Sequence, residues 1–259
     1  MPNTALITGA SSGIGMEFAR YHASKGGDVI LTARRKDTLD ALAAEVRTAH
    51  GVNAHVVALD LGAEGGAQAL YDHVKEAGLT VDILINNAGF GGQGRFLDRE
   101  LAKDLAMIDL NVKALVTLTH CFAADMVSNG GGRILNVAST AGFMPGPLQA
   151  TYFATKAFVT SFSQAIDQEY RKRGLTCTAL CPGYVKTEFA DVSDLNGTDL
   201  VSKGGATPDD VARHGYEAMM RGALVTVNEA KLGFMVNWII PLLPRRAVLK
   251  TVQRMQTKK

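Results

Sequence analysis

Thr8-Gly-Ala-Ser-Ser-Gly-Ile-Gly15 is a glycine-rich turn that joins an apolar run to a helical pattern near the start of the chain. Its glycines stand at positions 9, 13 and 15, so it is neither the G-x-G-x-x-G fingerprint nor a P-loop, which would continue with Gly-Lys-Ser or Gly-Lys-Thr. Where a strand enters a helix through such a turn, backbone N–H groups and the helix dipole can face a phosphate. A tight turn without a ligand is the alternative, but three glycines and two serines in this context favour a pyrophosphate site. The residues predicted to line it are Gly9, Ser11, Ser12, Gly13, Ile14 and Gly15.

Short apolar runs alternate with longer amphipathic stretches along the chain. The runs predict strands over 3–8, 28–33, 53–59, 82–86, 132–138, 175–181 and 223–227. The stretches predict helices over 13–25, 36–50, 64–77, 98–128, 151–173 and 208–221. This alternation implies parallel strands joined by right-handed crossovers, with helices on both faces of the sheet. We therefore expect one domain over residues 1–259: a doubly wound α/β Rossmann fold of about seven strands, with ligands beyond the carboxyl ends of the strands.

The composition excludes several classes of function. The 259 residues are 47% apolar and 20% charged, and the net charge of +2 is too small to indicate a nucleic-acid partner. Cys121, Cys177 and Cys181 have no metal-like spacing and are interpreted as reduced thiols of a cytoplasmic protein. The six histidines form no HxxxH or HExxH pattern, and no acidic cluster is present, so no metal site is predicted.

Neither end of the chain predicts a transmembrane segment. The N-terminus lacks a basic segment followed by a long apolar one, so no signal peptide is expected. The apolar stretch over 232–243 is shorter than the roughly 20 residues that a span needs, and Asn237 and Pro241 interrupt it. It is interpreted as a packed helix or a subunit contact, with peripheral membrane contact as the less favoured alternative. Six basic residues near the C-terminus are interpreted as solvated surface: Arg245, Arg246, Lys250, Arg254, Lys258 and Lys259.

Two arginines follow the second predicted strand, in Ala33-Arg34-Arg35. A site for NAD would place Asp or Glu about 20 residues beyond the glycine turn, where it accepts hydrogen bonds from the adenosine ribose. This chain has Ala33 there, and guanidinium groups bind a 2′-phosphate through paired, charge-assisted hydrogen bonds. Two solvent-facing arginines at a helix start are the alternative, although acidic residues suit that end of a helix better. We therefore predict NADP(H) as the cofactor.

Two further predicted strands end in polar residues, Leu59-Asp60-Leu61 and Asn86-Asn87-Ala88-Gly89. An Asx turn or a helix cap is the alternative role for each of these ends. Because the carboxyl ends of parallel strands share one edge of the sheet, both lie on the rim that carries the glycine turn. This shared position favours a role in cofactor binding.

Over nearly its whole length the chain resembles the short-chain dehydrogenase/reductase family. The resemblance is carried by TGASSGIG (8–15), Asp60, NNAG (86–89), Asn111, Ser139, YFATK (152–156) and PGYVKT (182–187). NNAGFG, YFATKAF and the late LLPRR are most similar to a subgroup of poorly assigned reductases, which in turn resemble 3-oxoacyl thioester reductases and other small carbonyl reductases. The resemblance implies Tyr152 as the general acid/base and Lys156 as its partner. It implies Ser139 as the hydroxyl that polarises the carbonyl, and Asn111 as a helix residue that organises a proton-relay water.

The resemblance also implies where the cofactor lies. Asp60, with Leu61 beside it, would meet the adenine. Asn87, Ala88 and Gly89 would line the dinucleotide path, which Tyr152 and Lys156 also reach. The residues implied around the nicotinamide carboxamide are Pro182, Gly183, Val185 and Thr187.

Tyr152 and Lys156 stand four positions apart in a predicted helix, so both side chains leave from the same face. By spacing alone, a solvated helix face is the commoner explanation, but the polar strand ends favour a chemical pair. A tyrosine of pKa about 10 is a poor reversible acid/base near neutrality, and lowering its pKa by about 3 units requires roughly 4 kcal/mol. We expect the nearby ammonium and the positive nicotinamide of the oxidised cofactor to lower it.

The residues expected around the substrate lie in 90–95, in 140–149 and in an irregular segment over 187–207, which we interpret as a lid. Four of the expected wall residues are apolar, which suits a hydrophobic ketone, aldehyde or acyl chain better than a small anion: Phe143, Met144, Pro145 and Phe189. Arg95 and Lys203 are candidates for a carboxylate or a thioester phosphate, with plain surface residues as the alternative. Residues 229–259 form a C-terminal extension.

These observations predict an NADP(H)-dependent oxidoreductase that reduces a 3-oxoacyl thioester or a hydrophobic ketone or aldehyde. Two alternatives remain open: an alcohol or sugar dehydrogenase that works oxidatively, and a dinucleotide-sensing protein without turnover. The intact set of Ser139, Tyr152 and Lys156 weighs against a sensor. The resemblance also suggests a homodimer or homotetramer packed through the helices over 98–128 and 151–173. Phe153, Phe158 and Phe162 are interpreted as core and subunit-contact residues.

Overall fold

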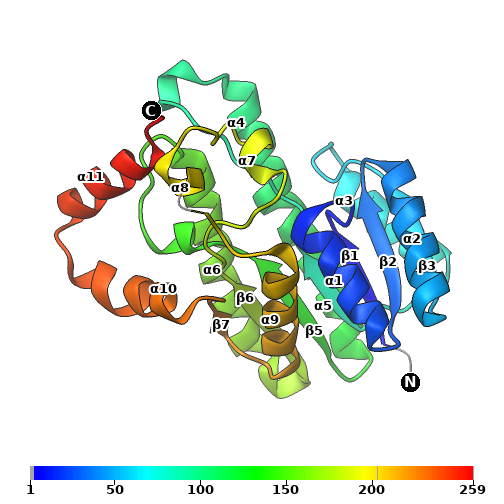
Figure 1. Cartoon of the computed structure of the whole chain (residues 1–259). Coiled ribbons are helices and arrows are strands. Elements are labelled where there is room, and N and C mark those ends of the chain that lie inside the picture. Colours follow the sequence, from blue (N-terminus) through cyan, green and yellow to red (C-terminus); the bar gives the residue numbers. More distant parts are fainter. Residues whose placement is uncertain (1–2, 203, 259) are drawn as a thin grey trace.

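The computed structural model describes residues 3–202 and 204–258. Seven parallel strands form one sheet in the order β3-β2-β1-β4-β5-β6-β7. The strands are β1 (Thr4–Thr8), β2 (Asp28–Ala33), β3 (Ala54–Ala58), β4 (Ile83–Asn86), β5 (Gly132–Val137), β6 (Leu175–Leu180) and β7 (Val225–Thr226). The order turns back at β1, from which the chain runs outward first through β2 and β3 and then through β4 to β7 (Figure 1). The predicted single-domain, doubly wound α/β fold is therefore confirmed.

Helices follow nearly every strand. The longer ones are α1 (Gly13–Ser24), α2 (Lys36–His50), α3 (Gly66–Glu76), α4 (Leu101–Ile108), α5 (Leu115–Ser128), α6 (Ala150–Tyr170), α9 (Pro208–Met220) and α11 (Arg245–Gln256). Three are short, namely α7 (Phe189–Val192), α8 (Asp199–Ser202) and α10 (Ala230–Phe234). The 3₁₀-helical turns are η1 (Phe96–Asp98), η3 (Thr140–Phe143), η4 (Arg171–Arg173) and η6 (Ile240–Leu242). The π-helical turns are η2 (Asp109–Ala114) and η5 (Met235–Ile239).

The two faces of the sheet bury separate apolar clusters. On one face, Phe18 of α1, Leu42 of α2 and Met219 of α9 pack against β1 and β2. On the other face, Leu70 of α3 and Phe122 of α5 pack against the same strands and β4. This burial on both sides explains why the strands are apolar at nearly every position.

Three boundaries differ from the sequence prediction. The single helix expected over 98–128 is divided into α4, the π-helical turn η2 and α5. The last strand is only Val225–Thr226, because it lies at the edge of the sheet and pairs with β6 alone. The segment 187–207 is not irregular throughout, since it contains α7 and α8.

The helical stretch Leu101–Ser128 is long and apolar enough to cross a membrane by length and composition alone. In this fold its second half covers the sheet, where Leu118, Phe122 and Met126 are buried. A helix that packs between a sheet and other helices has the same apolar composition, so this stretch is explained by the core.

Candidate active site

The glycine turn connects β1 to α1 in a conformation that needs glycine. Gly9 and Gly13 have φ of +67° and +54°, which side chains other than glycine rarely adopt. A Cβ on Gly9 would lie 2.8 Å from Nδ2 of Asn87, so the two strand ends touch there. Ser12 precedes α1 without a side-chain cap, and no acidic residue stands in the first helical turn. The N–H groups that begin α1 are thus left for a ligand, and this cradle fits a dinucleotide pyrophosphate.

Thr8 joins the glycine turn to the end of β4. Its hydroxyl accepts hydrogen bonds from the N–H groups of Asn87 and Ala88, each at 2.9 Å. The Asn87 amide in turn donates to the backbone oxygens of Thr8 and Gly9, at 2.9 and 3.3 Å. Asn87 and Ala88 were predicted as site residues and Thr8 was not, although Thr8 also stands at the end of a strand, β1. These bonds fix the two strand ends as one surface.

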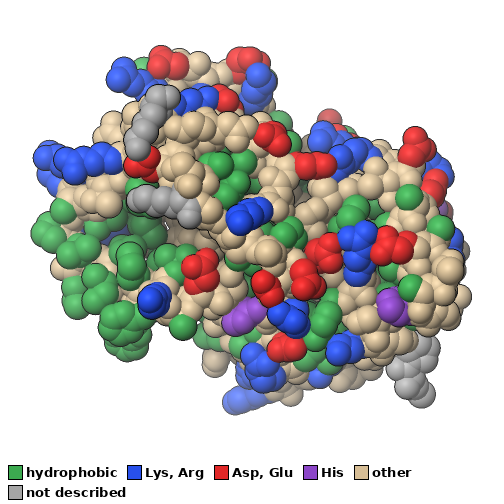
Figure 2. Space-filling model, viewed as in Figure 1, with side chains coloured by type: hydrophobic (Ala, Val, Ile, Leu, Met, Phe, Trp, Pro, Cys, Tyr) green, Lys and Arg blue, Asp and Glu red, His purple; other side chains and the backbone are tan. Residues whose placement is uncertain are grey.

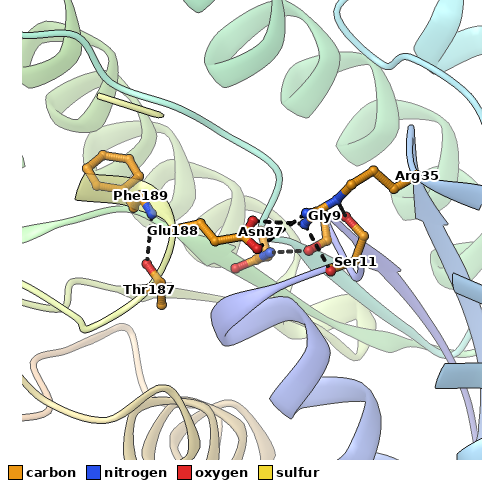
Figure 3. A network of polar contacts seen from close by, with 7 residues as sticks. All are labelled: Gly9, Ser11, Arg35, Asn87, Thr187, Glu188 and Phe189. Carbon is orange, nitrogen blue, oxygen red and sulfur yellow. Dashed lines mark hydrogen bonds and ion pairs between the residues drawn. The ribbon is translucent and has the colours of Figure 1, made fainter. Parts of the chain in front are cut away.

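Arg35 lies across the glycine turn and reaches the segment after β6. Its guanidinium donates to the hydroxyl and the backbone oxygen of Ser11, at 3.3 and 3.0 Å. It also forms a two-pronged pair with Glu188, at 3.3 and 3.0 Å (Figure 3). Glu188 was not predicted as a site residue, because 153 positions separate it from Arg35.

Arg34 and Asp60 lie at the neighbouring ends of β2 and β3. Nη1 of Arg34 is 4.0 Å from Oδ2 of Asp60, and the Arg34 side chain is 78% exposed. Asp60 also accepts from the N–H of Gly62 at 2.9 Å, which is the local turn considered as its alternative role. Leu61 is buried and lines a small cavity of about 10 Å³ with Thr8 and Ala88. Arg34 and Asp60 remain open toward solvent beside this cavity.

Ser139 and Tyr152 meet at the end of β5. Ser139 precedes η3, and its Oγ accepts from the N–H of Ala141 at 3.1 Å. Ser139 is also the neighbour whose hydroxyl lowers the pKa of Tyr152, the third residue of α6. The Tyr152 ring packs edge-on against Phe153 and at a tilt against Phe189, with ring centroids 6.2 and 5.4 Å apart.

Burial raises the pKa of Tyr152 to about 12, and the hydrogen bond from Ser139 offsets this only in part. The expected lowering included the positive charge of an oxidised nicotinamide and stays a prediction, whereas the protein's own groups leave this pKa above its ordinary value. The physical reason is that Tyr152 is dehydrated, whereas Lys156 is not among the groups that shift its pKa. Nζ of Lys156 lies 5.8 Å from the centre of the Tyr152 ring. Without a further positive charge, Tyr152 is a neutral phenol at physiological pH.

Lys156 is buried in the same helix and points toward β5. Its Nζ donates to the backbone oxygen of Val137 at 2.7 Å. Burial lowers the pKa of Lys156 to about 8. A Cβ on Gly89 would lie 3.6 Å from this Nζ, so the end of β4 faces the ammonium. Lys156 therefore lies between the end of β4 and the ring of Tyr152.

Lys156→Met is expected to stabilise the protein against unfolding, by an amount that falls as pH rises from 8 to 10.5. Below pH 8 the Lys156 ammonium is buried in the folded protein and exposed to water in the unfolded chain. Burying this charge lowers the free energy of unfolding of the wild type by an amount on the order of 1–3 kcal/mol. Above pH 8 the folded protein releases this proton first, and the cost disappears near the unfolded value of 10.5. Urea unfolding of both proteins across this range measures the difference. A difference that stays constant with pH would contradict the assignment, because the lost bond to Val137 contributes only a constant offset.

Asn111 lies in the π-helical turn η2 and is almost fully buried. Its amide accepts from the N–H of Phe90 at 3.1 Å and donates to the oxygen of Phe90 at 2.9 Å and to Thr155 at 3.2 Å. A Cβ on Gly89 would lie 2.9 Å from its Oδ1. Such wide turns inside helices often occur at functional sites. Here the turn directs Asn111 onto the segment after β4.

The segment after β6 forms another side of the same rim. The oxygen of Pro182 accepts from the N–H of Thr140 at 2.9 Å. Val185 is buried and bridges to Ala206, and a Cβ on Gly183 would lie 2.7 Å from Leu232. A Cβ on Gly13 would lie 2.9 Å from Thr187, so this segment touches the start of α1. The predicted positions therefore come together at the carboxyl ends of the strands.

The predicted substrate walls are largely apolar and are joined by the C-terminal extension. Tyr152 and Phe153 belong to a buried cluster with Val248 and Val252 of α11. The residues packed against this cluster are Phe90, Met144, Phe189 and Ile240. The contribution of α11 was not predicted, because its basic residues had been interpreted as plain surface. Lys203 and Lys259 lie outside the described residues.

The phenylalanines of α6 lie in different surroundings, and the subunit contact expected of them stays a prediction. Phe153 is buried beside Tyr152. Phe158 is 40% exposed and stacks on Phe162, with ring centroids 5.6 Å apart.

A cavity of about 500 Å³ lies away from this rim. Asn3, Gly26 and Gly27 line it, and these residues precede β1 and β2. It thus sits at the amino ends of the strands, where this class of sheet does not bind its ligands. Within residues 3–202 and 204–258, no group of three or more His, Cys, Asp or Glu is placed to hold a metal ion.

Comparisons with known proteins agree with this geometry. The sequence model of the short chain dehydrogenase family matches residues 3–196. The very-long-chain 3-oxoacyl-CoA reductase of Anas platyrhynchos is 30% identical over 256 residues, which cover 96% of this chain and 78% of that protein. Sulfoacetaldehyde reductase 2 of Chromohalobacter salexigens is 38% identical over 240 residues, covering 90% and 94%. A short-chain dehydrogenase from Sphingobium yanoikuyae, solved in complex with NADPH, has a TM-score of 0.85 and 31% identity and covers 100% of this chain and 99% of its own.

Proposed function

Because this chain belongs to the short-chain dehydrogenase family, whose members are oxidoreductases that act on CH–OH donors, we propose that it is an NADPH-dependent reductase of hydrophobic carbonyl compounds. The observation that carries the proposal is geometric: Ser139 follows β5, Lys156 donates to Val137 at the end of β5, and both lie on the rim that also holds the glycine turn. A reduction there needs a hydride for the carbon and a proton for the oxygen. A reduced nicotinamide supplies the hydride when bound.

The protein's own residues supply orientation and the proton. In this proposal the Ser139 hydroxyl donates to the substrate oxygen and holds it beside Tyr152. Tyr152 gives its proton to the developing alkoxide, which is a stronger base than the phenolate left behind even with the raised pKa of this tyrosine. Lys156, together with the positive charge that an oxidised nicotinamide would carry, stabilises the phenolate that remains. Asn111 holds the backbone of Phe90 through two hydrogen bonds, and in this proposal it also organises a proton-relay water.

The residues at and just after the carboxyl end of β2 support NADPH over NADH as the cofactor. Arg34 is exposed and Arg35 lies on Ser11, so both guanidinium groups border the place where an adenosine 2′-phosphate would reach the glycine turn. Neither Asp nor Glu stands at the end of β2, which is Ala33. The Sphingobium relative of known structure was solved with NADPH, which agrees with this choice.

Glu188→Gln is expected to tighten NADPH binding about two- to fivefold and to leave NADH binding unchanged. Glu188 forms an exposed ion pair with Arg35, and such pairs contribute about 0–1 kcal/mol. A 2′-phosphate that binds Arg35 has to break this pair in wild type but not in the variant. Titration calorimetry with both cofactors measures the change, with Asp191→Asn as a control three residues away in the same segment. Weaker NADPH binding in Glu188→Gln would contradict the account.

The apolar walls support a ketone, an aldehyde or a 3-oxoacyl thioester as substrate. Phe90, Met144 and Phe189 surround the Tyr152 cluster, and α11 adds two valines. The 3-oxoacyl-CoA reductase relatives are consistent with an acyl chain in this space. We propose that the segment 187–207, with α7 and α8, is the lid over it, and that 229–259 is the wall on the far side.

The test is NADPH consumption by the purified protein with 3-oxoacyl thioesters of graded chain length. Simple aldehydes and hydrophobic ketones are measured beside them, and NADH serves as the comparison. An optimum in acyl chain length identifies the thioester, whereas turnover confined to ketones or aldehydes identifies the other class. No turnover with any hydrophobic carbonyl would refute the proposal.

We also propose a homo-oligomer that works in the cytoplasm. Phe96, Leu97 and Leu101 are exposed on η1 and α4, which suits a subunit contact along the helices expected to form one. Cys177 and Cys181 are buried and unpaired, and burial raises their pKa values to about 12 and about 11. Such thiols suit a reducing compartment.

A further inference from the structure

The C-terminal extension carries a large apolar surface that the fold does not cover. Six side chains of α10, η5, η6 and the residue after them are exposed: Phe234, Met235, Trp238, Ile239, Leu242 and Leu243. Trp238 is 67% exposed and Leu242 is 84% exposed. Figure 2 shows hydrophobic side chains gathered over this part of the molecule. Only Val236 of η5 is buried, so the segment is anchored on one side and open on the other.

The same extension carries unpaired positive charge. Seven of the chain's 27 Lys and Arg fall within the extension, 229–259, and its first residue, Glu229, is the only one of the chain's 25 Asp and Glu there. Lys231, Arg245, Arg246, Lys250 and Arg254 are exposed, and within residues 3–202 and 204–258 none of them forms an ion pair. The positive side chains of α11 flank the apolar surface at its upper left in Figure 2.

We propose that the segment 230–246 docks this protein on an anionic phospholipid surface. Helical segments that lie in a membrane interface combine Trp, Phe and Leu on one side with Lys and Arg beside them. Tryptophan favours the head-group level, and each Lys or Arg near the surface adds attraction to anionic lipid. The segment 230–246 has all three features and no acidic residue to oppose them.

Charge argues against a second copy of the chain as the occupant. A two-fold contact would place this basic, acid-free segment against itself, with no carboxylate to pair the facing cations. The exposed apolar residues of η1 and α4 are different, because Asp98, Glu100 and Lys103 lie among them. That mixed surface suits a protein contact, and it supplies a matched control.

Docking there would bring the active site close to the lipid. Ile240 of η6 packs against the buried cluster that contains Tyr152, while Leu242 two residues later is exposed. One short segment thus has an inner side at the substrate walls and an outer side toward the surface. An apolar substrate would pass from the bilayer to the site along this segment.

Trp238 gives a direct probe, because it is the only tryptophan of the chain. Vesicles of phosphatidylcholine with phosphatidylserine are expected to shift its emission to the blue and to sediment the protein. Vesicles of phosphatidylcholine alone are expected to bind at least about tenfold more weakly, and added salt should weaken binding to the anionic vesicles. No binding to anionic vesicles, or equal binding to both kinds, would overturn the proposal.

Variants assign the binding to the segment. Arg245→Gln with Arg246→Gln is expected to weaken anionic-vesicle binding roughly thirtyfold, and Leu242→Ser roughly tenfold. Lys103→Gln with Lys113→Gln, and Leu97→Ser, are the matched controls on exposed positions elsewhere and should bind as wild type does. Thermal unfolding confirms that each variant is folded.

Sedimentation velocity without lipid tests whether the surface is a subunit contact. If Leu242→Ser dissociates an oligomer, the surface is a subunit contact and the proposal is wrong. Because no arm needs turnover, the result does not depend on the proposed reductase activity.

Discussion

Tyr152→Phe is expected to lower kcat for carbonyl reduction by about 10²- to 10⁴-fold while NADPH binds almost as in wild type. The substitution removes one hydroxyl, the proposed proton donor, and keeps the ring that packs on Phe153 and Phe189. Ser139 keeps hydrogen-bond partners at Pro182 and Ala141, so no buried polar group is stranded. Stopped-flow turnover and NADPH fluorescence titration measure the two quantities separately.

Tyr216→Phe is the matched control for this change. Tyr216 is also buried, but its hydroxyl is bonded to Nδ1 of His22 on the opposite side of the molecule from the rim. It should lose stability at most and keep kcat. If both variants reduced the carbonyl as fast as wild type, Tyr152 would not be the proton donor. If neither wild type nor variant turned over while NADPH bound tightly, the sensor alternative would be the better account.

Arg34→Ala is expected to weaken NADPH binding about 10- to 100-fold and to leave NADH binding within about twofold. Hydrogen bonds to a charged group contribute roughly 1.5–3 kcal/mol, and only the 2′-phosphate would lose them. The Arg34 side chain is largely exposed and reaches only Asp60 at 4.0 Å, so its removal should not disturb the fold. Dissociation constants for the two cofactors check the prediction.

Lys36→Ala controls for general loss of positive charge near the site. Lys36 is exposed, stands two positions after Arg34 and pairs with Asp40 on α2. It should change both cofactors equally and by little. Equal weakening of NADPH and NADH by Arg34→Ala would show that Arg34 does not contact the 2′-phosphate, and a preference for NADH in wild type would overturn the choice of cofactor.

The fold could be predicted because its signals are local. Apolar runs and amphipathic stretches give the seven strands and the main helices within a few residues. The glycine turn, Asn87 and the pair Tyr152 and Lys156 could also be found, because each stands at a strand end or on one helix face. The π-helical turn η2 could not, since one wide turn does not change the apolar period enough to be seen.

What the sequence could not predict depends on distant contacts and on burial. The pair of Arg35 and Glu188 joins two segments that have no pattern in common. Burial inside the fold raises the pKa of Tyr152, which spacing cannot show, and the predicted lowering by the ammonium and an oxidised nicotinamide together stays a prediction. The role of α11 was missed for a similar reason, because its buried face of Val248 and Val252 is hidden among basic residues.

Transfer of the hydride itself tests the central claim most directly. NADPH carrying deuterium in the hydride position of its nicotinamide is incubated with the wild-type protein and the best 3-oxoacyl thioester or ketone. We expect one deuterium on the former carbonyl carbon of the alcohol for each NADPH oxidised, and almost none with Tyr152→Phe. An alcohol without deuterium, or tight NADPH binding without any alcohol, would contradict the assignment of this chain as a carbonyl reductase.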